Sequence, residues 1–184
     1  MDGKEDREMS EAAEATAVAE QQLVLFRVEQ EVYGLDIQRV QRLLPIPPIT
    51  KIPGAPDFVE GVTEVRGEVV PVVNMKKRMG YPKTDWSEEA RVIIVELDGQ
   101  DVHLGLIVDA VTEVFKLPTS DIEPVDEAAV KFQDPIVTGI GKDGERLIVL
   151  IDANYILSGE QMAGMEQSIS CASDGGEQRL ERAA

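Results

Sequence analysis

The sequence has little of what most catalytic and metal sites are built from. Its 184 residues include one cysteine, one histidine and one tryptophan, and aromatic residues make up only 4% of the chain. A zinc site usually draws on several cysteine and histidine side chains, and this chain has two in total. The histidine, His103, lies between two apolar residues, and no serine has the sequence context of a nucleophile. The sequence therefore predicts neither enzyme activity nor a bound metal or cofactor.

Positive charge is also scarce. The chain carries 18 lysine and arginine residues against 35 aspartate and glutamate residues, which gives a formal net charge of −17. A protein that binds nucleic acid or an anionic membrane needs a clustered basic face. The sequence offers only Lys76, Lys77 and Arg78 beside one another, so we expect no nucleic-acid partner and no anionic membrane partner. We interpret this basic run as a solvated face, with a patch for an anionic partner as the alternative.

Much of the acidic charge lies at the two ends of the chain. Residues 1–20 carry seven acids and two bases, and residues 158–184 carry five acids and two bases, which leaves a net charge of −9 on residues 21–157. Segments with high charge and little apolar surface are typical of flexible tails. The sequence predicts one folded domain over residues 22–157, with a short terminal helix beginning at Asn154. Flexible tails are expected at 1–21 and 158–184.

The single cysteine, Cys171, falls in the second tail and cannot form an internal disulfide bond. This is typical of the reducing cytoplasm. No apolar run approaches the roughly 20 residues of a membrane span, and the first residues are acidic, unlike a signal peptide. We expect a cytoplasmic protein with no segment inserted in a membrane.

Short apolar runs separated by turn residues predict an all-β fold with little helix. The order hairpin, connector, hairpin occurs twice: Gly34 matches Gly105 at an offset of 71 residues, and Gly61 matches Gly139 at an offset of 78. The two halves are expected to divide near residues 81–90. A further short helix is expected at Glu127–Val130. The predicted hairpins join residues 23–28 to 32–37, 59–65 to 69–73, 91–97 to 102–108 and 136–140 to 146–151.

Two patterns resemble chemical sites. Residues 139–144 match G-x-G-x-x-G, but a strand follows where a nucleotide site needs a helix, so we interpret these glycines as part of a hairpin. Asp109 and Asp152 each follow an apolar strand and could form an acid–base pair. We favour a capping role, in which each carboxylate accepts backbone N–H groups, and Asn74 can do the same.

The stretch from Phe58 to Gly80 has the strongest pattern. Its two β-branched runs predict a hairpin with Arg66 and Gly67 at the turn, where Gly67 supplies a positive φ. The guanidinium of Arg66 would then be exposed at the tip. A local pair with Glu64 or Glu68 is possible, but we favour a role in recognition.

Residues 61–74 (Gly-Val-Thr-Glu-Val-Arg-Gly-Glu-Val-Val-Pro-Val-Val-Asn) resemble the core motif G-x-x-x-L-R-G-x-x-x-P-V-x-D-L of the CheW family. These proteins are adaptors that join chemoreceptors to the histidine kinase CheA. The likeness extends over residues 22–157 and includes Tyr33-Gly34-Leu35-Asp36-Ile37 and Gly105-Leu106-Ile107-Val108-Asp109. The resemblance implies two small SH3-like five-stranded β-barrel subdomains packed side by side.

The resemblance also implies which residues face the partners. Arg66 and Gly67 are expected at this surface, together with Val40 and Arg42. Arg42 stands where the family commonly has glutamate, and Asn74 stands where it more often has aspartate. The complete set of expected partner-binding residues is Arg66, Gly67, Val40, Arg42, Gly61, Val65, Val108 and Val111.

By this resemblance we expect a non-enzymatic chemotaxis adaptor without a cofactor. It would link the cytoplasmic tip of methyl-accepting chemoreceptors to the regulatory domain of CheA in signalling arrays, and it would be a monomer on its own. Two alternatives stay open. One is an adaptor of the same type in a non-motility chemosensory-type pathway, and the other is a β-barrel that binds a small molecule, which a thermal-shift screen would detect.

Overall fold

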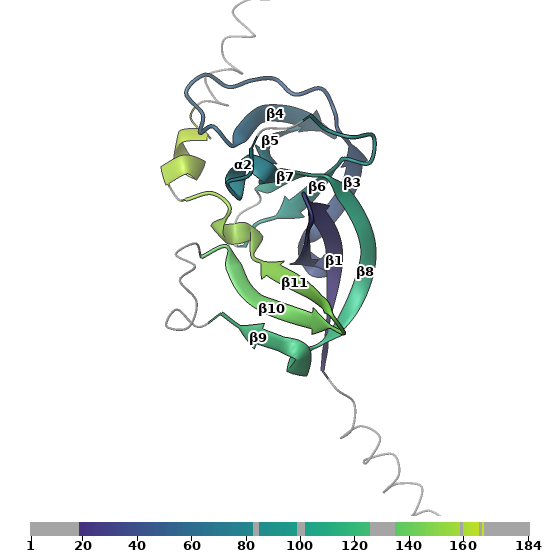
Figure 1. The fold of residues 1–184 in the computed structure, drawn as a ribbon. Helices are drawn as coiled ribbons and strands as arrows, with labels where there is room; N and C mark the ends of the chain where they lie inside the picture. The colour runs from purple at the N-terminus through teal and green to yellow at the C-terminus, as the bar shows by residue number, and fades with distance from the viewer. Residues whose placement is uncertain are drawn as a thin grey trace, which may run out of the picture.

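The computed structural model describes residues 19–82, 85–98, 102–125, 135–158, 160–165 and 167. Most of these residues are in strands, which lie in two groups, one above the other in Figure 1. The described helical elements are short, and the last of them is a helix at residues 160–165. The other elements are β1 (Glu20–Val28), β2 (Glu31–Asp36), η1 (Ile37–Arg39), β3 (Val40–Pro45), β4 (Val59–Val65), β5 (Glu68–Asn74), α2 (Met75–Arg78), β6 (Arg91–Glu96), β7 (His103–Val108), β8 (Ala110–Pro118), η2 (Thr119–Asp121), β9 (Ile122–Pro124), β10 (Val137–Asp143), β11 (Arg146–Ile151) and η3 (Ala153–Tyr155).

The strands form two sheets, each the centre of one subdomain. The five-stranded subdomain has the strand order β3-β6-β7-β5-β4, and the six-stranded subdomain has the order β8-β1-β2-β11-β10-β9. The predicted all-β fold with two subdomains is confirmed. The resemblance implied five strands in each subdomain. One subdomain has five, and the other has a sixth, β9, a three-residue strand that pairs with β10.

The chain passes between the subdomains at two points, and neither is the polar segment near residues 81–90. It leaves β2 for β3 through η1, and it leaves β7 for β8 at Asp109. Residues 81–90 connect α2 to β6, and both β5 and β6 belong to the five-stranded subdomain. The predicted seam is wrong because each half of the sequence contributes strands to both subdomains.

In each subdomain, a hairpin from one half of the chain pairs with a hairpin from the other half. β2 pairs in parallel with β11, with Gly34 opposite Leu150, and β7 pairs in parallel with β5, with Gly105 opposite Val72. The sequence repeat relates these pairs, since Val72 matches Leu150 at the same offset of 78 residues as Gly61 and Gly139. A Cβ atom would lie 3.0 Å from Leu150 Cδ2 on Gly34, and 3.1 Å from Val92 Cγ1 on Gly105. Both glycines therefore leave space for side chains of a neighbouring strand, β11 beside Gly34 and β6 beside Gly105.

One hydrophobic core joins the subdomains. Its members include Phe26 and Leu35 from the six-stranded subdomain and Val73, Ile93 and Leu106 from the five-stranded subdomain, each at most 1% exposed. There are also two smaller hydrophobic clusters, and each consists of residues from one subdomain. Since apolar burial is the dominant favourable term in folding, we expect the subdomains to unfold together.

The folded structure continues beyond residue 157, where the sequence predicted a flexible tail. Residues 160–165 are helical, and Met165 is only 3% exposed in the main core, with Met162 packed against it. The helix expected to begin at Asn154 is present only as η3, which ends at Tyr155. Two apolar residues three positions apart are too short a pattern to predict a helix from sequence.

Some predicted features lie outside the described residues. These are most of the N-terminal tail, the helix at Glu127–Val130 and the end of the chain that contains Cys171. Within the described part of the chain, no helix has the length and apolar character needed to cross a membrane.

Candidate partner-binding surface

The predicted hairpin with Arg66 and Gly67 at its tip is confirmed. β4 ends at Val65, β5 begins at Glu68, and the φ angles of Arg66 and Gly67 are +50° and +82°. Two successive positive φ values are typical of the type I′ turn that closes tight hairpins. A positive φ is common for glycine and costs on the order of 1 kcal/mol or more for a residue such as arginine. Arg66 therefore occupies a position that its backbone does not favour.

The equivalent turn of the other hairpin has no such conflict. Gly144, which matches Arg66 at the offset of 78 residues, has a φ of +60° in the turn between β10 and β11. The Arg66 side chain is exposed and makes no hydrogen bond or ion pair with any described residue. The strained turn thus presents an exposed guanidinium, and backbone strain of this kind is often retained at functional sites.

Apolar and acidic side chains surround this tip. Val65 is half-buried and packs against the smaller core of the five-stranded sheet, while Val69 is 45% exposed. Glu64 and Glu68 are exposed on either side of the turn. Arg66 is therefore a single cation between two carboxylates, beside an exposed apolar residue.

The second predicted part of the surface lies on β3. Val40 and Arg42 are half-buried, whereas the alternate residues Gln41, Leu43 and Pro45 are exposed. Successive side chains of a strand point to opposite sides. The residues predicted from the sequence, Val40 and Arg42, therefore lie on the less exposed side of β3. Leu43, on the opposite side, is an apolar side chain with 46% exposure.

Leu43 lines a groove between the edge strands of the two sheets. This open groove, about 650 Å³ in volume, lies between β3 and β8 and also receives Val111, one of the predicted residues. Arg27 Nη2 lies 3.3 Å from Glu89 Oε2, and both side chains line the groove. The full lining is Arg27, Leu43, Pro45, Glu89, Arg91, Ala110, Val111 and Thr112.

Two of the predicted partner-binding residues are buried. Val108 is 0% exposed at the end of β7. Gly61 is buried at a β-bulge with a φ of +147°, and a Cβ atom there would overlap the backbone carbonyl of Thr50. Neither residue can reach a partner directly, so both support the surface from inside.

The basic run is not a solvated face. Lys77 Nζ lies 3.1 Å from Glu60 Oε1, and Arg78 Nε donates to the carbonyl oxygen of Ile156 at 2.8 Å. The guanidinium of Arg78 also lies over the ring of Phe58, at 5.7 Å. These cations bind groups within the chain, so neither the predicted solvated face nor a patch for an anionic partner describes them.

Lys76, the first residue of the run, is buried at 5% exposure. Its Nζ atom lies 2.9 Å from Asp109 Oδ1, 3.4 Å from Glu29 Oε1 and 5.1 Å from the ring centroid of Trp86. Burial lowers the pKa of Lys76, but hydrogen bonds and charge interactions with Asp109 and Glu29 outweigh it, so the pKa lies above its ordinary value. The ammonium stays charged and links α2 of the five-stranded subdomain to the β1–β2 turn of the other.

The connection from β2 to β3, where the chain also passes between the subdomains, is held by an exposed network of polar side chains. Arg39 pairs with Asp98, whose backbone N–H donates to Asn154 Oδ1 at 2.8 Å. The hydrogen bond from Arg39 holds the pKa of Asp98 below its ordinary value. Both crossings are therefore held by charged side chains, one network buried and the other open to solvent.

The predicted capping roles are confirmed. Asp152 Oδ1 accepts from the backbone N–H of Asn154 at 2.9 Å, and Asn74 Oδ1 accepts from that of Lys77 at 3.3 Å. Asp109 Oδ2 accepts from the backbone N–H of Glu29 at 2.6 Å. Residues 139–144 lie in the β10–β11 hairpin as expected, and the described residues contain no cluster of three or more side chains able to hold a metal ion.

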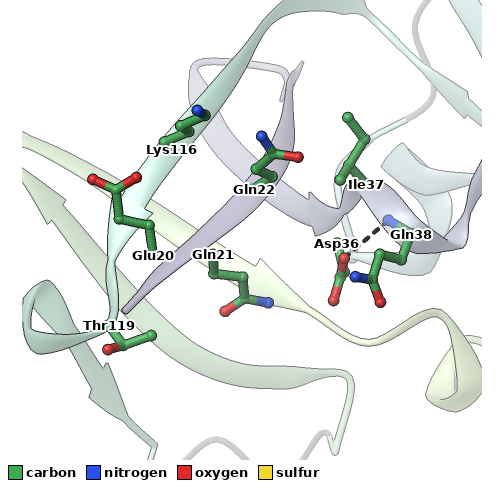
Figure 2. Close-up of a pocket in the computed structure, with 8 residues that line it drawn as sticks. All are labelled: Glu20, Gln21, Gln22, Asp36, Ile37, Gln38, Lys116 and Thr119. Atoms are coloured by element: carbon green, nitrogen blue, oxygen red, sulfur yellow. Dashed lines mark hydrogen bonds between the residues drawn. The ribbon is translucent and has the colours of Figure 1, made fainter. Parts of the chain in front are cut away.

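A further recess, shown in Figure 2, lies where β1 begins and β8 ends. Its volume is about 460 Å³, and a hydrogen bond of 2.9 Å joins the backbone N–H of Gln38 to Asp36 Oδ1 within it. Sites for small molecules are usually concave and mostly apolar. This lining is mostly polar, so it gives no support to the small-molecule alternative. The lining residues are Glu20, Gln21, Gln22, Asp36, Ile37, Gln38, Lys116 and Thr119.

Known proteins share both the sequence and the fold of this chain. Residues 22–161 match the model of the CheW-like domain family. The chain is 36% identical over 143 residues to the chemotaxis protein CheW of Klebsiella aerogenes, which covers 78% of this chain and 85% of that protein. It is 31% identical over 140 residues to the chemotaxis protein CheW of Bacillus subtilis, with 76% and 88% covered.

A solved structure agrees with these matches. The crystal structure of the scaffolding protein TtCheW from Thermoanaerobacter tengcongensis has a TM-score of 0.70 and 37% sequence identity, and the match covers 78% of this chain and 96% of that chain. The family match includes both subdomains, the groove and the Arg66 tip. The chain therefore belongs to the CheW-like family, the non-enzymatic chemotaxis adaptors that couple receptors to the kinase CheA.

Proposed function

We propose that this adaptor binds its two partners through two separate surfaces, the groove between β3 and β8 and the hairpin tip at Arg66. The single observation that carries the proposal is the exposed guanidinium of Arg66, which pairs with no described residue and lies in a turn that favours glycine. The partners are the cytoplasmic tip of a chemoreceptor and the regulatory domain of CheA. The adaptor is a cytoplasmic monomer when it is alone.

The groove suits an amphipathic helix from the receptor. Leu43, Pro45 and Val111 supply apolar side chains along it, and Arg27, Glu89 and Arg91 supply charges of both signs at its walls. Helices that dock in grooves place apolar anchors inside and polar groups at the rim. Because β3 and β8 belong to different subdomains, a bound helix would contact both.

The tip suits a more local contact. Arginine is among the residues that most often dominate the energy of a protein interface, because its planar fork makes several hydrogen bonds in one geometry. Val65 and Val69 offer apolar contact beside it. Together these residues would form an anchor surrounded by the weaker contacts of a rim.

Binding of purified receptor and kinase fragments to single variants tests the proposal. Leu43→Glu should weaken receptor binding by roughly tenfold or more, because it places a carboxylate in the apolar part of the groove. Leu147→Glu is the matched control, since Leu147 is 55% exposed but lies on β11 and does not line the groove. Unchanged receptor binding by Leu43→Glu would exclude the groove as the receptor site.

A further inference from the structure

A row of polar side chains crosses the five-stranded sheet and ends at the Arg66 turn. It begins at Gln41, whose Nε2 donates to Glu96 Oε2 at 2.7 Å. Glu96 on β6 is directly opposite His103 on β7. His103 Nδ1 lies 3.1 Å from Glu68 Oε2, and Glu68 directly follows the turn. The row thus connects β3, where the sequence placed part of the partner surface, to the hairpin tip.

His103 lies between two carboxylates in this row. Glu68 faces it from β5 and Glu96 from β6, while Arg66 lies in the turn that precedes Glu68. The His103 side chain is 26% exposed and that of Glu68 is 66% exposed, so both remain accessible to solvent. Asp101, two residues before His103, lies outside the described residues.

We propose that His103 is a positioning residue of the Arg66 surface, and that its protonation strengthens the binding of the partner that Arg66 contacts. This inference rests on the proposed function of the tip. An imidazole is the side chain that ordinarily changes charge near neutral pH, and this chain has only one. The surface would therefore respond to a change of pH through this side chain.

The mechanism follows from competition for Glu68. When His103 is protonated, its positive charge holds and neutralises the Glu68 carboxylate, which leaves the Arg66 guanidinium available to a partner. When His103 is neutral, Nδ1–H can still donate to Glu68, but the carboxylate keeps its full charge two residues from Arg66. The guanidinium is then drawn toward Glu68, and the partner must displace it.

The first experiment measures the affinity of the partner that Arg66→Ala weakens, at pH 6.0 and pH 8.0. The wild-type adaptor should bind about two- to fivefold more tightly at pH 6.0, the size of effect expected from an exposed ion pair. His103→Gln keeps a hydrogen-bond donor but cannot be charged, so its affinity should lose this difference. Titrating groups on the partner contribute equally to the pH dependence of the wild type and of His103→Gln, so they do not affect the comparison. Glu68→Gln should also remove the difference, and Asp121→Asn in η2 serves as a charge control away from the row.

The second experiment follows the imidazole directly. Because the chain has one histidine, its ring gives a single set of NMR signals whose midpoint of titration can be measured with and without the partner. Partner binding should move the midpoint to higher pH if the protonated form binds more tightly.

The outcomes separate this inference from the proposed function. If Arg66→Ala leaves both partners bound normally, the tip is not a binding surface and both proposals fail. If Arg66→Ala weakens binding but His103→Gln keeps the wild-type pH dependence, only the role of His103 is wrong. A midpoint that does not move on partner binding also overturns it, and unchanged melting temperatures show that the variants remain folded.

Discussion

Lys76 and Asp109 form a buried ion pair at the point where the chain leaves one subdomain for the other. Asp109 is the residue between β7 and β8, and Lys76 lies in the helix that follows β5. The pair, at 2.9 Å, is close to Arg27, whose carbonyl oxygen accepts from the backbone N–H of Asp109 at 2.9 Å. Since Arg27 lines the groove, this ion pair fixes one wall of the groove relative to the five-stranded subdomain.

Replacing Lys76 should therefore destabilise the whole domain. Lys76→Met leaves the carboxylates of Asp109 and Glu29 without their buried cation, and breaking a buried pair in this way typically costs about 3–5 kcal/mol. Lys142→Met is the control, because its pair with Glu123 is exposed and contributes only about 0–1 kcal/mol. Urea denaturation of both variants measures the difference, and equal losses would contradict the structural role of the buried pair.

The two crossings should respond differently to pH. The raised pKa of Lys76 means that its stabilising contribution is fully present below the unfolded value of about 10.4 and is lost as the pH rises through the folded value. The lowered pKa of Asp98 has the opposite sense: its contribution is present above about pH 3.9 and is lost as the pH falls through the folded value. Comparing the wild type with Asp98→Asn should show a stability difference at pH 6 that shrinks toward pH 2.

The helix at residues 160–165 should contribute to stability, contrary to the flexible tail predicted from sequence. Met165→Ala should cost about 2–5 kcal/mol, the usual range for a buried methionine. Glu160→Ala, on an exposed side chain of the same helix, should cost little. A melting temperature that is the same for Met165→Ala and the wild type would show that this helix does not stabilise the core.

The local structure of this chain could be predicted because its signals are local. Alternating β-branched residues and the Arg66–Gly67 pair fixed the position of a hairpin, and the turn has the positive φ values that were expected. The internal repeat was also visible, since Gly34 and Gly105 lie at equivalent positions of the repeat and each is close to side chains of a neighbouring strand. Each of these inferences uses residues within one or two strands.

The arrangement of these elements depends on contacts between distant residues, and there the sequence failed. The parallel pairings of β2 with β11 and of β7 with β5 join strands far apart in the chain, so the exchange of hairpins left no local pattern. Lys76 looked like a solvated cation because its partner Asp109 lies on another part of the chain. The choice of Arg42 over Leu43 came from the family motif, whereas the alternation of burial on β3 points to Leu43.

The turn of the β4–β5 hairpin gives a test of backbone strain. Gly67 has a φ of +82°, so Gly67→Val should destabilise the protein by about 1–3 kcal/mol even though no atom beyond the adjacent residues lies within 4 Å of the new Cβ. Arg66→Gly should have the opposite effect on stability, because glycine accepts the φ of +50° without strain. Thermal denaturation measures both. A Gly67→Val variant as stable as the wild type would show that the turn has another conformation.

Arg66 should separate stability from function. Its guanidinium has no described partner, so Arg66→Ala should change the free energy of unfolding by less than about 0.5 kcal/mol. If the guanidinium anchors an interface, the same change should weaken partner binding by about 1–3 kcal/mol. Arg66→Lys should recover only part of this loss, because it keeps the charge without the planar fork. Melting temperature, receptor binding and kinase binding decide the matter: a marked loss of stability would make Arg66 a structural residue, and normal binding to both partners would remove it from the surface.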